Sequence, residues 1–437
     1  MIALAMSLEI VSSSNYDCTL RADEHRTRIW ERETMGQYTE QLKNVQYEIS
    51  PEDDNYTEKL LSVAKSFRDF GEALDVFIVH KGFAGDVANV DEKVEFIKSK
   101  FQAVAISPLP RNLRKWFTEK KRIEKRKIAF QFCFAFELDL QECEEFFRTV
   151  CLQRGFDCHY IEEAIYYYAI SNRLSYAEAQ EMLEKAPDDV KGKLDFKGEV
   201  LFTESIIKEI NRFKSKDELI QFFQENLEQF GYNNATAYKY IKEIWQRIER
   251  TNGLAEKEKA LLFPKLVGND SGKKRSVWDI YLQILGLYDF DDDNSPLFVL
   301  DTDRTLKPIL KNNELLHPLA EDSFPDRQGL EAILRGEHKS NELVRKTIIL
   351  LVFYKYWTSL LVKKGSNSYR ANPDDSERCY AEINRYLVDA GYPTLYAGNP
   401  YDWIFLFAIQ DEYPVETFRY FMRELYIIKE DELSANK

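Results

Sequence analysis

The chain has 437 residues and a formal net charge of −14; 44% of its residues are hydrophobic, 14% are aromatic and 31% are charged. This balance excludes a disordered chain, and the acidity excludes nucleic-acid binding over the whole surface, so that such binding requires a local basic patch. Because only 17 glycines and 13 prolines interrupt so many large side chains, the composition predicts an all-α, multi-domain helical bundle architecture.

The first region, residues 1–107, contains two segments with apolar residues at helical spacing. The spacing predicts a helix within 55–80 and another over 90–106. The sequence SPLPR at 107–111 breaks this pattern, because proline disfavours helix at its own position and at the preceding one. We therefore predict an N-terminal helical region that ends at this break.

A strongly basic segment, RNLRKWFTEKKRIEKRK, occupies residues 111–127 and contains nine basic and two acidic residues. On an acidic protein it is a candidate surface for nucleic-acid phosphates, with Trp116 and Phe117 as possible anchors to the core. We expect one exposed positive face formed by the candidate nucleic-acid-binding residues Arg111, Arg114, Lys115, Lys120, Lys121, Arg122, Lys125, Arg126 and Lys127. Two other interpretations stay open: a solvated connector, and docking of the segment on an acidic face of the same protein.

Two stretches after this segment are similar to each other: LDLQECEEFF at 138–147 and LSYAEAQEML at 174–183, at an offset of 36 residues. Each follows an apolar helix pattern and has a capping box in which a short polar N-cap residue precedes a glutamate by three positions. The boxes are Asp139 with Glu142 and Ser175 with Glu178, and a weaker third match has Ser215 with Glu218. We predict a tandem helix-turn-helix-like repeat of 128–150 and 164–186 within a region 108–190, with independent amphipathic helices as the alternative.

The helix, short turn and capped second helix resemble the first two helices of Xre-type helix-turn-helix domains, with Gln141–Phe147 and Ala177–Leu183 as scaffold helices. In that family a third helix reads the major groove, so the resemblance implies nucleic-acid binding. The stretches that follow here, 152–160 and 186–193, lack the character of a recognition helix, which predicts weak sequence preference. The whole chain also resembles uncharacterised all-helical proteins of bacterial mobile elements and defence loci, and this resemblance implies no activity.

The rest of the chain is predicted to be helical in two regions, a middle region 191–300 that contains an acidic loop and a C-terminal domain 301–437. The apolar run at 347–362 is shorter than a membrane span and is interrupted by Lys355, so it predicts a buried core helix.

One short stretch supports an enzymatic alternative. LFVLDTDRTL at 297–306 resembles the pattern of haloacid-dehalogenase phosphatases, which implies Asp301 as a nucleophile and Asp303 as an acid/base near Mg²⁺. Arg304 stands where that family usually has glycine, and helices follow where the family's fold needs parallel strands.

Six scattered cysteines predict free thiols in a reducing cytoplasm, and their spacing predicts no metal site. We expect no cofactor. The sequence favours a non-enzymatic regulatory or accessory protein that binds nucleic acid or a protein partner and no membrane. The alternatives are a protein-interaction scaffold and a metal-dependent phosphohydrolase using Asp301 and Asp303.

Overall fold

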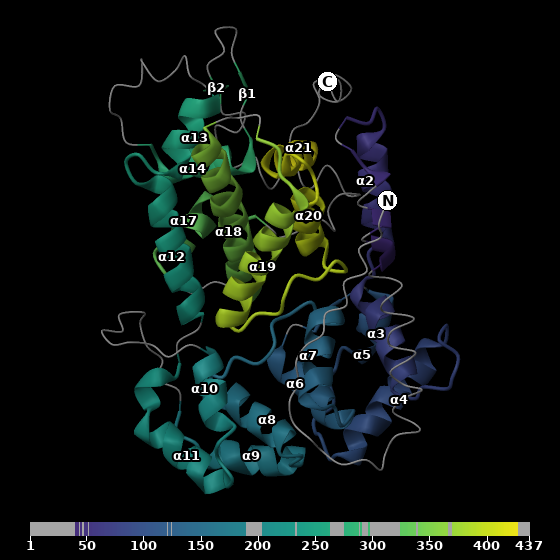
Figure 1. Cartoon of the computed structure of the whole chain (residues 1–437). Coiled ribbons are helices and arrows are strands. Elements are labelled where there is room, and N and C mark those ends of the chain that lie inside the picture. Colours follow the sequence, from purple (N-terminus) through teal and green to yellow (C-terminus); the bar gives the residue numbers. More distant parts are fainter. Residues whose placement is uncertain are drawn as a thin grey trace.

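A computed structural model of the chain (Figure 1) describes residues 40–42, 44–45, 48–50, 52–119, 121–123, 125–188, 203–231, 234–262, 275–287, 289–290, 296–297, 324–337, 340–365 and 369–426. The regular secondary structure of this part of the chain is helical apart from one antiparallel pair of two-residue strands, β1 (Asp289–Phe290) and β2 (Pro296–Leu297). Asp289 pairs with Leu297 and Phe290 pairs with Pro296. The all-α prediction is therefore confirmed.

The buried apolar side chains form two clusters, called here the lower core and the upper core after their places in Figure 1. The lower core is built by α3 (Phe70–His80), α4 (Val90–Ala103), α5 (Leu113–Thr118), α6 (Arg126–Ala135), α7 (Leu140–Thr149), α8 (Ile161–Ser171), α9 (Tyr176–Lys185), α10 (Thr203–Ile210) and α11 (Lys216–Glu225), with a 3-10 turn at Leu227–Gln229. The upper core is built by α2 (Tyr56–Ser66), α12 (Ala235–Glu249), α13 (Leu254–Leu262), α14 (Val277–Leu285), α17 (Arg327–Leu334), α18 (Asn341–Lys364), α19 (Pro373–Asp389), α20 (Pro400–Ile409) and α21 (Pro414–Tyr426).

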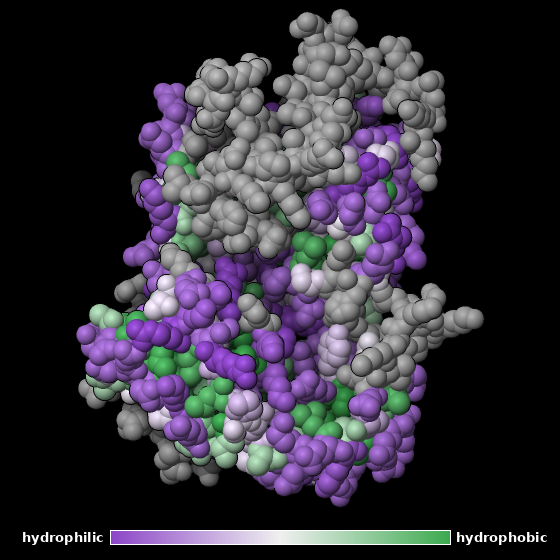
Figure 2. Space-filling model, turned by 180° about the vertical axis from the view of Figure 1, so that it is seen from behind, coloured by the Kyte–Doolittle hydropathy of each residue, from purple (hydrophilic) through white to green (hydrophobic). Residues whose placement is uncertain are grey.

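These two cores group the helices differently from the four predicted regions. The predicted boundaries after residues 190 and 300 lie outside the described residues, so the four-region division stays a prediction. Seen from behind, apolar residues reach the surface in several patches over the lower core, between hydrophilic residues (Figure 2).

The chain passes from the upper to the lower core at a break inside the predicted helix of 55–80. The backbone of Phe67 is extended (ψ 130°), and its ring packs edge-on against Trp403 of the upper core with centroids 6.1 Å apart. Asp69 then starts α3 with a capping box, because its carboxylate accepts from the Glu72 N–H and the Glu72 carboxylate accepts from the Asp69 N–H. The new cap explains why the continuous apolar pattern over 55–80 folds as two helices, α2 and α3.

The turns of the pairs α6–α7 and α8–α9 match at the predicted offset. Each first helix ends near a residue in the left-handed region, Glu137 (φ 50°) or Arg173 (φ 55°). The next N–H, of Leu138 or Leu174, donates to the carbonyl five residues back at 2.9 or 2.8 Å, as in a Schellman motif. All three predicted capping boxes are present, at Asp139/Glu142, Ser175/Glu178 and Ser215/Glu218. These are local matches, and the tandem arrangement of the two pairs stays a prediction.

The apolar run at 347–362 lies in α18 and is mostly buried in the upper core, as predicted. Its charged residue, Lys355, pairs with Glu382 and donates to the Tyr386 hydroxyl at 3.1 Å. Among the described helices, none combines the length and the apolarity that crossing a membrane requires.

Candidate nucleic-acid interface

The basic segment is held on the lower core by three apolar side chains. Trp116 of α5 is buried, as the sequence predicts, whereas Phe117 is only partly buried; Leu113 of α5 and Ile123 beyond the helix are also buried. The Trp116 ring packs on Phe70 and Phe132 at centroid distances of 6.0 and 5.7 Å. These anchors leave the basic side chains between them at the surface, where α5 covers only 113–118 and α6 begins at 126.

Four of the nine predicted residues are paired with carboxylates, Arg126 inside the lower core and three others at the surface. The Arg114 guanidinium contacts Asp91 of α4, and the Lys115 and Lys121 ammonium groups lie 3.4 Å from the Glu119 carboxylate. Desolvation acts to raise the pKa of Glu119, but hydrogen bonds from both lysines outweigh it and lower that pKa. These pairs reduce the positive charge of this part of the segment.

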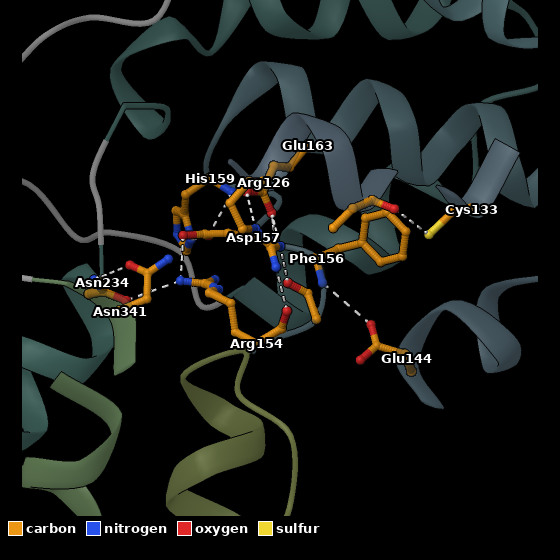
Figure 3. A network of polar contacts seen from close by, with 12 residues as sticks. Arg126, Cys133, Glu144, Arg154, Phe156, Asp157, His159, Glu163, Asn234 and Asn341 are labelled. Atoms are coloured by element: carbon orange, nitrogen blue, oxygen red, sulfur yellow. Dashed lines mark hydrogen bonds and ion pairs between the residues drawn. The ribbon is translucent and has the colours of Figure 1, made fainter. Parts of the chain in front are cut away.

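Arg126 has a structural role inside the lower core. Its guanidinium donates to the Glu163 carboxylate at 3.2 and 2.9 Å and to the carbonyls of Arg154 and Gly155 at 2.7 Å each (Figure 3). It also lies over the Phe147 ring at 4.9 Å. A half-buried guanidinium that donates four hydrogen bonds joins α6 to the start of α8 and has little capacity left for a phosphate.

Four of the predicted residues line one groove: Arg111, Arg122, Lys125 and Lys127. All four are exposed, and none makes an ion pair or a side-chain hydrogen bond within the part of the chain that the structure describes. The described residues that line this basic groove include no aspartate or glutamate. Lys120, the ninth predicted residue, lies outside the described residues.

The walls of the basic groove come from three parts of the chain that are distant in sequence. They are the loop 104–112 after α4, the first turns of α6, and the start of α9 with Tyr176, Ala177 and Gln180. Gln131 of α6 donates to the Tyr176 hydroxyl at 3.1 Å and so connects two of these walls. Residue type alone did not identify the two glutamines; only the fold brings them beside the basic segment.

The aromatic residues of the basic groove do not form a stacking platform. Trp116 is 2% exposed and Tyr176 is 9% exposed, so their faces are covered by the core. Binding of single strands without sequence preference usually combines positive charge with exposed aromatic rings on which bases stack. The groove offers only the first of these, which favours contacts with phosphates over contacts with bases.

A second polar cluster, next to Arg126, joins the two cores (Figure 3). Arg154 Nη1 lies 2.7 Å from Asp157 Oδ2 and donates to Asn234 Oδ1 at 3.0 Å. Asn234, which precedes α12, donates to Asn341 Oδ1 at 2.8 Å and accepts from the Tyr392 hydroxyl. Burial acts to raise the pKa of Asp157, but the Arg154 charge and the contacts from His159 together outweigh it and lower that pKa to about 2. Both ionised groups are 1% exposed, so this junction cluster has a structural role.

The other predicted chemistry has no site among the described residues. Asp301 and Asp303 lie outside them. Five cysteines are free and buried, and burial raises the pKa of Cys151 to about 12, which is typical of an inert thiol. Within the described ranges, no group of three or more histidine, cysteine, aspartate or glutamate side chains is placed to hold a metal ion.

Comparison with models of protein families, with curated protein sequences and with solved structures finds no match to this chain. The resemblances to Xre-type domains and to proteins of mobile elements and defence loci therefore stay predictions. Function is inferred from the basic groove and its charges alone.

Proposed function

We propose that this protein binds the phosphate backbone of nucleic acid in the basic groove. The observation that carries the proposal is the convergence of four exposed cations on a chain of net charge −14, with no ion pair to them and no carboxylate in the groove lining among the described residues. Like charges that line one groove repel one another, and a bound polyanion relieves that repulsion while releasing its own counterions. The groove is therefore a favourable place for a polyanion on a surface that otherwise repels it.

Binding depends weakly on base sequence in this proposal. Lysine and arginine at the groove contact phosphates, which position a nucleic acid but carry no sequence information. The stretch 152–160, which follows the first predicted scaffold helix, is not a helix in its described part and contributes Arg154 and Asp157 to the junction cluster. A recognition helix is therefore not part of the proposed mode of binding.

The tandem repeat belongs to the same proposal. We propose that 128–150 and 164–186 are duplicated helix pairs that frame the groove, α6 from the first copy and α9 from the second. The matching turns at Glu137 and Arg173 and the matching capping boxes support this interpretation. We also propose a non-enzymatic cytoplasmic protein with a regulatory or accessory role, as the sequence favours.

Fluorescence anisotropy with duplex and single-stranded oligonucleotides, at several salt concentrations, tests the proposal. Four phosphate contacts give a slope of log K against log salt of about −3.6 for duplex DNA and about −2.8 for single strands. Two triple variants remove the same charge from different places. The groove variant is Arg111→Gln/Lys125→Gln/Lys127→Gln, and the matched control is Arg114→Gln/Lys115→Gln/Lys121→Gln.

With duplex DNA, we expect the slope of log K against log salt to become less negative by about 2.7 in the groove variant. The control variant should keep most of the wild-type slope. Equal losses in the two variants would mean that only total charge matters, which contradicts binding in the groove. Absence of binding by the wild type at low salt would overturn the proposal and favour the protein-interaction scaffold.

A further inference from the structure

The basic groove carries uncharged polar groups in addition to its positive charge. Its volume is about 830 Å³, within the usual range of ligand sites. Among its described lining residues are two glutamines, Gln131 of α6 and Gln180 of α9. A polyanion in the groove therefore meets two side-chain amides as well as the four cations, and the orientation of these amides bears on which polyanion fits.

The amide nitrogen of each glutamine is bound to a tyrosine of the lower core. Gln131 Nε2 donates to the Tyr176 hydroxyl at 3.1 Å, and Gln180 Nε2 donates to the Tyr166 hydroxyl at 3.2 Å. The Tyr166 hydroxyl in turn donates to the Glu162 carboxylate at 3.2 Å, so it acts toward Gln180 as an acceptor. These contacts orient both amides and leave the amide oxygen, an acceptor, as the unused end of each side chain.

Neither amide oxygen has a protein partner in the described part of the chain. No described N–H or O–H group donates to Gln131 Oε1 or to Gln180 Oε1. Gln131 is only 7% exposed, and a polar side chain buried to this degree nearly always has its hydrogen bonds filled. The groove therefore offers two hydrogen-bond acceptors to a ligand that carries donors beside its negative charges.

RNA is the nucleic acid whose backbone carries such a donor at every residue. Phosphate and deoxyribose oxygens within a strand only accept hydrogen bonds, whereas the 2′-hydroxyl of ribose both donates and accepts. A DNA backbone would bring acceptors against the two amide oxygens and would separate them from water without replacing that contact. An RNA backbone can place a phosphate on a cation and a donor on a neighbouring amide oxygen.

The depth of the amides favours a single strand over a duplex. Gln131 and its partner Tyr176 are 7% and 9% exposed, so only a thin ligand that enters the groove can reach them. A double helix is wide and stiff, and it would contact the exposed cations at the rim. The buried rings of Trp116 and Tyr176 offer no stacking face for bases, so the backbone is the part of the strand that the groove can recognise.

Resting on the proposed function of this groove, we propose that its ligand is single-stranded RNA. Phosphates of the strand bind the four cations, and ribose 2′-hydroxyls donate to Gln131 Oε1 and Gln180 Oε1. Because these contacts involve only backbone groups, base sequence is not read. DNA binds more weakly because it lacks the donor, and double-stranded RNA binds more weakly because it does not reach Gln131.

Fluorescence anisotropy with four oligonucleotides of one sequence tests the proposal: single-stranded RNA, single-stranded DNA, single-stranded 2′-fluoro RNA and the RNA duplex. Fluorine at the 2′ position keeps the conformation of ribose but cannot donate a hydrogen bond. Gln131→Met/Gln180→Met removes both amide oxygens, and Gln180→Met alone is the milder variant at a half-buried position. Gln221→Met/Gln246→Met is the matched control, because these exposed glutamines do not line the groove. Circular dichroism checks that each variant is folded.

We expect wild type to bind single-stranded RNA about tenfold more tightly than each of the other three oligonucleotides, as for two neutral hydrogen bonds. Gln131→Met/Gln180→Met should reduce the preference for RNA over DNA to within about twofold and leave the affinity for DNA within about twofold of wild type. Gln180→Met alone should reduce that preference to about threefold. The control variant should keep the wild-type preference.

Three results would overturn the proposal: equal affinity of wild type for RNA and DNA, equal affinity for RNA and 2′-fluoro RNA, or a full preference for RNA in Gln131→Met/Gln180→Met and Gln180→Met. The groove variant with three fewer cations separates this failure from failure of the proposed function. If it loses binding of RNA and DNA that wild type binds equally, the groove still binds nucleic acid and only the assignment to RNA is wrong. If it binds both as wild type does, both proposals are wrong.

Discussion

The buried pair of Arg154 and Asp157 predicts a specific dependence of stability on pH. The pKa of Asp157 is about 2 in the folded protein and 3.8 in the unfolded chain. Because the folded value is the lower one, the stabilisation is fully present above the unfolded pKa and is lost as the pH falls through the folded one. A difference of this size corresponds to about 2 kcal/mol of unfolding free energy, lost between about pH 5 and pH 2.

Asp157→Asn tests this reasoning because it keeps the size of the side chain and removes its charge. The guanidinium of Arg154, 1% exposed, then faces a neutral amide where it had a carboxylate, and it keeps its hydrogen bond to Asn234. Breaking a buried pair from one side costs about 3–5 kcal/mol, so the free energy of unfolding at pH 7 should fall by about that amount. Between pH 7 and acid pH, the free energy of unfolding should also fall by about 2 kcal/mol less in this variant than in wild type.

Urea unfolding, followed by circular dichroism at pH 7, 5, 4, 3 and 2, measures both effects. Glu145→Gln is a useful comparison, because that carboxylate is partly exposed and its pair with Arg148 lies at the surface. If Asp157→Asn and wild type lose stability in parallel from pH 5 to pH 3, Asp157 is not the group that titrates and the reasoning is wrong.

The turns at Glu137 and Arg173, and helix α7 after the first of them, give three further predictions. Glu137→Gly and Arg173→Gly should each stabilise the protein by up to about 1 kcal/mol in thermal unfolding, because glycine adopts a positive φ without the penalty of a Cβ atom; a loss of stability would contradict this. Phe147→Ala should cost about 3–5 kcal/mol, as for a fully buried aromatic side chain, and a cost below about 1 kcal/mol would mean that α7 is not packed as described. Glu142→Ala should cost about 0.5–2 kcal/mol through the lost capping box, and an unchanged stability would show that the cap contributes nothing.

Features that depend on short stretches of sequence were predictable. Capping boxes need a short polar side chain and a glutamate three residues later, and all three predicted boxes are present. The apolar residues of the basic segment indicated which of its sides packs on the core, and Leu113 and Trp116 are buried there. The break at Phe67 was not predicted, because apolar spacing continues through it and only packing on Trp403 shows that the chain changes core there.

Features that depend on residues far apart in sequence were not predictable. The basic segment showed where cations are concentrated, but not that Tyr176 and Gln180 would stand opposite them. The junction cluster was missed because Arg154 and Asn234 are 80 residues apart.

The ion pairs of the basic segment explain why the number of basic residues in a sequence overestimates the number of cations that are available for binding. A cation contributes to binding only if no nearby carboxylate already neutralises it. The fold brings such carboxylates from positions near and far along the chain. Glu119 comes from within the segment, whereas Asp91 and Glu163 come from helices 23 and 37 residues away from their arginine partners. The groove cations escape this neutralisation because the walls opposite them carry glutamine, tyrosine, proline and apolar side chains among their described residues. The selectivity of the groove for polyanions therefore depends on its uncharged walls as much as on its basic residues.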